Sequence, residues 1–183
     1  MLKLANCLLV IDLQNGVCKS EQPVARLNQL IKGVNARIDA YQAENRPIIF
    51  VQHNDETLIA GQSTWQIMPE LNVPKTAIFV QKTHADSFWQ TNLQTLLSQM
   101  QIKSLEICGA QTEYCVDTTI KVAHHLGYQL QMVAGLSTTT DNAYMTAEQT
   151  IAFYEGIWQG RFLKLAKMDG QNNRLFWCTT TKN

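Results

Sequence analysis

The chain has 183 residues, of which 45% are hydrophobic and 16% are charged, and its 15 Lys and Arg residues balance its 15 Asp and Glu residues. This length is typical of one domain with one core, so we expect residues 1–183 to form a single domain. A net charge of zero gives no long-range field that would attract nucleic acid or an anionic membrane surface, which argues against both partners. No apolar run approaches the roughly 20 residues that span a bilayer, and we expect a cytoplasmic protein.

Six short apolar runs predict strands, and the longer stretches between them predict helices. The run at 4–11 has no polar alternation, which is typical of a strand that is buried on both faces. In chain order, the predicted strands are 4–11, 48–52, 77–81, 104–108, 128–133 and 162–166, and the predicted helices are 23–44, 87–100, 114–126 and 142–157.

The ends of the predicted helices carry recognisable signals. Ser87 and Gln90 have the spacing of a capping box, and Gly127 follows the third helix as a C-terminal glycine. Alternation of strands and helices indicates an α/β fold, a three-layer α/β/α sandwich with a doubly wound, mainly parallel, six-stranded sheet.

The fold prediction points to a site, because ligands of such sheets bind beyond the carboxyl ends of the strands. Asp12, His53, Lys82 and the segment 109–115 follow four predicted strands, so we expect them to converge. No glycine-rich phosphate-binding motif follows any strand, which argues against a nucleotide.

The five cysteines are an odd number without CxxC spacing, which argues against a disulfide framework and against structural zinc. Most free cysteines are buried hydrophobic residues. Cys115 differs, because an N-cap at Thr112 would place it in the first turn of a helix, where the helix dipole favours a thiolate and lowers the thiol pKa. Lys82 would lower this pKa further, and Asp12 could accept the thiol proton. Asp12 also has an ordinary interpretation as a helix N-cap or a turn residue. Taken alone, Lys82 is better explained as an ordinary lysine at a strand end than as a functional residue.

Three motifs carry a family resemblance: VIDLQNG, FVQKTHADSFWQTNLQTLL and ICGAQTEYCVDTTIKVAHHLGY. In order and spacing they resemble the isochorismatase-like cysteine hydrolases, over roughly residues 4–142. The resemblance implies a catalytic triad of Asp12, Lys82 and Cys115. It also implies a cis peptide bond between Ala110 and Gln111, and an oxyanion hole formed by the backbone N–H groups of Gln111 and Cys115.

The family includes nicotinamidases, N-carbamoylsarcosine amidase and isochorismatase. The resemblance therefore implies an enzyme that cleaves a C–N bond of a small amide or ureido substrate through a cysteine thioester. Two alternatives remain: an isochorismatase-type vinyl-ether hydrolase, which needs no cysteine at this position, and a non-catalytic thiol switch or binding protein. The partners implied are a small-molecule substrate and further copies of the chain, in a dimer or tetramer.

Nicotinamidases bind a metal through a D-x-H motif and a further histidine. Here His53 and Asp55 have no second histidine nearby, so we predict no metal and no cofactor. We predict that the substrate pocket is lined by residues that each also have an ordinary structural interpretation: Gln14, His53, Trp65, Phe88 and Tyr114. The tail 169–183 is expected to cap the sheet or to pack across a neighbouring subunit.

Overall fold

The structure is a computed structural model that describes residues 3–168 and 175–178. All six predicted strands are present in it, with ends that shift by at most three residues. They are β1 (Cys7–Ile11), β2 (Ile48–His53), β3 (Ile78–Lys82), β4 (Ser104–Ala110), β5 (Gln129–Val133) and β7 (Lys164–Met168). Two short strands join them, β6 (Ser137–Thr138) and β8 (Leu175–Trp177).

The strands form one sheet in the order β3-β2-β1-β4-β5-β7-β8, and β6 pairs with the end of β4. Neighbouring strands run parallel except for β7 and β8, which are antiparallel. The prediction of a doubly wound, mainly parallel sheet is confirmed, whereas the predicted number of strands was too low. Strand β6 has only two residues, too few for a sequence pattern, and β8 lies within the polar tail, of which only residues 175–178 are described.

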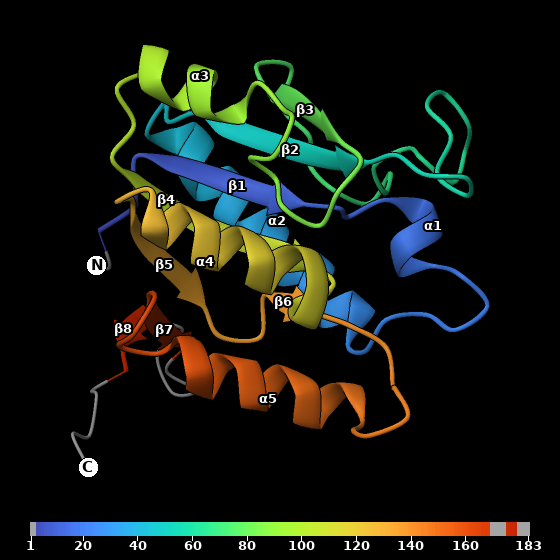
Figure 1. The fold of residues 1–183 in the computed structure, drawn as a ribbon. Coiled ribbons are helices and arrows are strands. Elements are labelled where there is room, and N and C mark those ends of the chain that lie inside the picture. Colours follow the sequence, from blue (N-terminus) through green and yellow to red (C-terminus); the bar gives the residue numbers. More distant parts are fainter. Residues whose placement is uncertain (1–2, 169–174, 179–183) are drawn as a thin grey trace.

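Helices cover both faces of the sheet (Figure 1). One face packs against α2 (Leu27–Ala43), and the short helix α1 (Asn15–Cys18) adds Cys18 to the same cluster. The other face packs against α3 (Leu93–Gln99), α4 (Asp117–His125) and α5 (Ala147–Trp158). These layers are the predicted α/β/α sandwich. No helix of the described residues is long and apolar enough to cross a membrane.

Two predicted helix starts are wrong. The residues from Ser87 to Asn92 form turns instead of a helix, because the Ser87 hydroxyl is buried in a hydrogen bond with Thr119 Oγ1 on α4 (2.8 Å) and cannot cap. The capping box of this chain lies at Thr146 and Gln149, where it begins α5, five residues after the predicted start.

Gly109 brings the segment that carries Cys115 against the end of β1. Its φ is +140°, and a Cβ at this position would lie 2.1 Å from the carbonyl oxygen of Ile11. Only glycine accommodates both the dihedral angle and this contact. The close approach of β4 to β1 therefore places the turn after β4 beside Asp12.

Candidate active site

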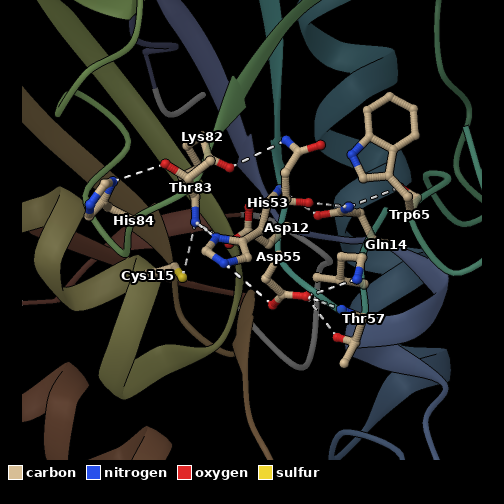
Figure 2. Close-up of polar contacts among 12 residues, drawn as sticks. Asp12, Gln14, His53, Asp55, Thr57, Trp65, Lys82, Thr83, His84 and Cys115 are labelled. Atoms are coloured by element: carbon tan, nitrogen blue, oxygen red, sulfur yellow. Dashed lines mark hydrogen bonds and ion pairs between the residues drawn. The ribbon is translucent and has the colours of Figure 1, made fainter. Parts of the chain in front are cut away.

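Three side chains from distant parts of the sequence meet at the carboxyl edge of the sheet (Figure 2). Asp12 directly follows β1, Lys82 is the last residue of β3, and Cys115 lies in a π-helical turn, η1 (Thr112–Val116), that follows β4. Lys82 Nζ lies 2.6 Å from Asp12 Oδ2 and 3.1 Å from Cys115 Sγ. The sheet order explains the meeting, because β1 and β4 are the neighbours at which the direction of winding reverses.

The carboxylate of Asp12 is buried, and only one of its two oxygens has a hydrogen-bond partner among the described residues. Its side chain is 2% exposed, and its backbone turns out of β1 with a φ of +51°, in the left-handed region. Burial raises the pKa of the Asp12 carboxyl above its ordinary value of 3.8, although the Lys82 ammonium opposes the rise. Lys82 binds Oδ2, whereas Oδ1 is buried and has no hydrogen-bond partner among the described residues. A carboxylate with a raised pKa and an unoccupied oxygen is suited to accept a proton.

The thiol of Cys115 does not have the lowered pKa expected from the sequence. Burial, together with the negative charge of Asp12, raises it to about 12, against the opposing effect of Lys82. The expected capping is also absent: Gln111 precedes the turn, and Thr112 donates its hydroxyl proton to Ser137 Oγ (3.1 Å). The helix dipole and Lys82 were expected to lower this pKa, but burial and the Asp12 carboxylate outweigh them. Burial and the Asp12 carboxylate thus favour the protonated thiol over the thiolate.

The turn that holds Cys115 is set by its backbone. The Ala110–Gln111 peptide bond is cis, as the family resemblance implies. The carbonyl of Gln111 accepts hydrogen bonds from the N–H groups of Tyr114 (3.1 Å) and Val116 (3.2 Å). Cys115 is thus presented by a closed turn at the end of a buried strand, and its side chain is half-buried.

His53 contacts the cluster directly. It is the last residue of β2 and pairs in register with Lys82 on β3. Its Nδ1 lies 3.0 Å from Lys82 Nζ, and its Nε2 lies 3.6 Å from Asp55 Oδ2. Burial and the Lys82 charge lower the pKa of the His53 imidazole. The predicted convergence of His53 and Lys82 is confirmed, whereas a hydrogen bond between the two side chains was not predicted.

Gln14 holds the walls of the site in place. It is completely buried, it donates to the carbonyls of His53 and Trp65, and it accepts from the N–H of His53. These contacts occupy its amide, so Gln14 is not free to bind substrate. Gln52, which the sequence analysis did not single out, donates to the same Trp65 carbonyl (3.1 Å).

The three aromatic candidates lie in different settings. Trp65 is half-buried, and its indole N–H is a buried donor without a partner among the described residues, which leaves it available to a ligand. Tyr114 neighbours Cys115 in the chain and is 55% exposed. Phe88 is part of the hydrophobic core and stacks on Tyr128, with ring centroids 6.0 Å apart. Phe88 thus packs in the core on the sheet face that α3, α4 and α5 cover, and its contact with substrate stays a prediction.

One group of side chains has the composition of a metal site. The ligand atoms of Asp12, His53 and Cys115 all lie within 4.8 Å of one another. Lys82 Nζ is in hydrogen-bond contact with all three residues, so their acceptors already surround a cation. A metal ion would have to displace this ammonium, and the residues do not fit a metal while Lys82 is present.

Comparison with known proteins identifies the family. Residues 6–155 match the family model described as the isochorismatase domain. A crystal structure of an isochorismatase family protein is 45% identical with a TM-score of 0.85, and the match covers 87% of this chain and 96% of that one.

Two curated relatives are more distant. The secreted isochorismatase effector Isc1 of Verticillium dahliae is 25% identical over 127 residues, which are 67% of each chain. Nicotinamidase 3 of Arabidopsis thaliana is 22% identical over 176 residues, covering 87% of this chain and 79% of the relative. The chain thus belongs to the isochorismatase family and is a cysteine hydrolase of that family.

Proposed function

We propose that this enzyme hydrolyses a C–N bond of a small amide or ureido substrate through a thioester on Cys115. The observation that carries the proposal is the buried ammonium of Lys82, which joins a carboxylate with a free oxygen to the only half-buried thiol at this edge of the described sheet. The similarity to a nicotinamidase supports amide chemistry.

In the first half of the reaction, Asp12 accepts the proton of the Cys115 thiol as sulfur attacks the substrate carbonyl. The negative charge that develops on the carbonyl oxygen is stabilised by the N–H groups of Gln111 and Cys115 acting as the oxyanion hole. The C–N bond then breaks, Asp12 delivers its proton to the departing nitrogen, and the acyl group stays on sulfur as a thioester.

In the second half, Asp12 takes a proton from water, and the resulting hydroxide attacks the thioester. The C–S bond breaks, and the proton returns from Asp12 to the sulfur of Cys115. Since the resting thiol has a pKa of about 12, it needs a base at the moment of attack rather than a preformed thiolate. The raised pKa of Asp12 makes its carboxylate a stronger base for this step.

The test is ammonia release from a panel of small amides and ureido compounds, with a matched control cysteine. Cys115→Ala is expected to abolish turnover, whereas Cys178→Ala, which changes the other half-buried thiol, is expected to leave it intact. Mass spectrometry of the wild type mixed with substrate should detect the acyl group on the peptide that contains Cys115. Ammonia release that survives Cys115→Ala would contradict the thioester mechanism. No ammonia release from either protein would contradict the amide reaction and favour the isochorismatase-type cleavage of a vinyl ether.

A further inference from the structure

The Lys82 ammonium is surrounded by as many acceptors as it has protons. A lysine ammonium has three N–H donors and no lone pair. Three acceptors face it: Asp12 Oδ2 at 2.6 Å, His53 Nδ1 at 3.0 Å and Cys115 Sγ at 3.1 Å. With a side chain that is completely buried, Lys82 has no water to replace a missing acceptor.

The contact also fixes the tautomer of His53. Because the ammonium can only donate, Nδ1 must carry a lone pair, and the ring proton lies on Nε2. On that side Nε2 faces Asp55 Oδ2 at 3.6 Å. The Asp55 carboxylate is itself held by its other oxygen, which accepts from the N–H groups of Thr57 and Leu58 (Figure 2).

We propose that His53 is a positioning residue of this enzyme: it accepts the third proton of the Lys82 ammonium and thereby holds that ammonium between Asp12 and Cys115. The inference deepens the proposed function and rests on it. This role differs from the contact with substrate that the sequence predicted for His53. The two ring nitrogens of His53 face protein side chains: Nδ1 faces Lys82, and Nε2 faces Asp55.

Two properties of the strand pairing make the arrangement specific. His53 and Lys82 are directly opposite in the parallel register of β2 and β3, so their side chains leave the sheet on the same face. Gln14 holds the backbone of His53 on both sides, through its N–H (2.7 Å) and its carbonyl (3.0 Å). Gln14 therefore holds the backbone of His53, and Lys82 and Asp55 contact the two nitrogens of its ring.

The first test compares three replacements of His53 with one control. His53→Asn keeps an acceptor near the position of Nδ1, His53→Gln moves it outward toward the position of Nε2, and His53→Leu removes it. His84→Leu is the matched control, because His84 is exposed and its ring nitrogen bonds only to the neighbouring Thr83 hydroxyl.

We expect His53→Leu to lower kcat about tenfold or more with KM within about threefold of wild type, since misplacing a catalytic group lowers the rate and not binding. His53→Asn should retain most of the rate, His53→Gln less, and His84→Leu all of it. An increase in KM without a loss of kcat would overturn the proposal in favour of substrate contact. If His53→Leu does not fold, equal rates for the Asn and Gln variants would overturn it.

A second readout needs no substrate, so it separates this proposal from the amide reaction. Lys82 stabilises the thiolate of Cys115, and a displaced ammonium does so less. The rate of alkylation of Cys115 by iodoacetamide at fixed pH should fall about threefold or more in His53→Leu and not in His53→Asn. The same ranking in a protein that hydrolyses no amide would support the positioning role and contradict the proposed function. Equal alkylation rates in all variants would overturn the positioning role.

Asp12, His53 and Cys115 form a cage of acceptors around Lys82 Nζ, and this cage can be probed with a metal. Removing the ammonium in Lys82→Ala leaves a carboxylate, an imidazole and a thiol around the vacated position, which is a zinc-binding donor set. Titration with Zn²⁺ against a chromophoric chelator should show binding about tenfold tighter or more than in wild type, because three donors then converge on one ion. Adding His53→Leu should remove the gain, and adding His84→Leu should not. A gain that does not depend on His53 would overturn its place in the cage.

Discussion

Among the described residues, Glu106 and Asp12 are carboxylates buried beside a buried basic side chain, and of the two only Asp12 has an oxygen left free. Glu106, in the middle of β4, is 1% exposed, and all of its bonding capacity is used. Its Oε1 accepts from Arg37 Nε (2.5 Å), and its Oε2 accepts from Arg37 (2.9 Å), Tyr41 (3.1 Å) and Gln131 (2.7 Å). Asp12 is equally buried, but only its Oδ2 is bonded, to Lys82.

The difference separates a structural carboxylate from one that is arranged for chemistry. A buried charge is tolerated when its hydrogen bonds are complete, as at Glu106. At Asp12 the incomplete set leaves one oxygen able to take a proton, while burial raises the carboxyl pKa. The two sites lie on neighbouring strands, one in the middle of the sheet and the other at its carboxyl edge.

The largest expected effect comes from changing carboxyl to amide at both sites. Asp12→Asn removes the proposed base, and we expect kcat to fall about 10²–10⁴-fold, the usual contribution of general acid–base catalysis. Glu106→Gln, the matched control, should leave kcat within about threefold of wild type, because Glu106 lies away from the reacting atoms. Steady-state assays of both variants check this, and equal losses would contradict the distinction between the two carboxylates.

The dependence of wild-type activity on pH is a second test of Asp12 as the proposed base. The pKa of Asp12 is raised, so the carboxylate that we propose as the base is present above that raised value. Activity should therefore fall as the pH decreases through it, at a higher pH than an ordinary aspartate with a pKa of 3.8 would give.

The next effect concerns stability. Glu106→Ala leaves the guanidinium of Arg37 buried without its carboxylate, since the Arg37 side chain is 9% exposed. We expect the free energy of unfolding to fall by about 3–5 kcal/mol, as is usual when one partner of a buried ion pair is removed. Urea denaturation followed by circular dichroism measures this loss. A loss as small as that of an exposed ion pair, about 0–1 kcal/mol, would show that Arg37 finds water or another partner.

The long strands and the place where their carboxyl ends meet could be predicted from the sequence. All six long strands were predicted, because a parallel sheet buried on both faces requires uninterrupted apolar runs. The meeting of Asp12, Lys82 and the segment of Cys115 followed from the topology, which brings the carboxyl ends of the strands together. Strand β6 was missed because a two-residue strand has no pattern of its own.

Side-chain states were predicted less well, because they depend on burial and on neighbours from other elements. The direction of the Cys115 pKa shift was wrong, since burial and Asp12 outweigh Lys82 and the turn. Ser87 fitted a capping box, but Thr119 on another helix takes its hydroxyl, whereas the equivalent pattern at Thr146 does cap α5. A local motif can be used in two ways, and the tertiary partner decides between them.

The smallest predicted effect tests whether the bonds around Glu106 are redundant. Tyr41→Phe removes one hydroxyl, which donates to Glu106 Oε2 and accepts from the N–H of Ala5, at 3.1 Å in both cases. Arg37 and Gln131 still bond the same oxygen, so the carboxylate stays satisfied and only the N–H of Ala5 loses its partner. We therefore expect a loss of about 1–2 kcal/mol in the free energy of unfolding, without a change in kcat. Urea denaturation of Tyr41→Phe beside Glu106→Ala measures both. A loss as large as that of Glu106→Ala would mean that the stability of the cluster around Glu106 depends on each of its hydrogen bonds. Asp12, a buried carboxylate with one unbonded oxygen, would then depend on its ion pair with Lys82 more strongly than the distance between them indicates.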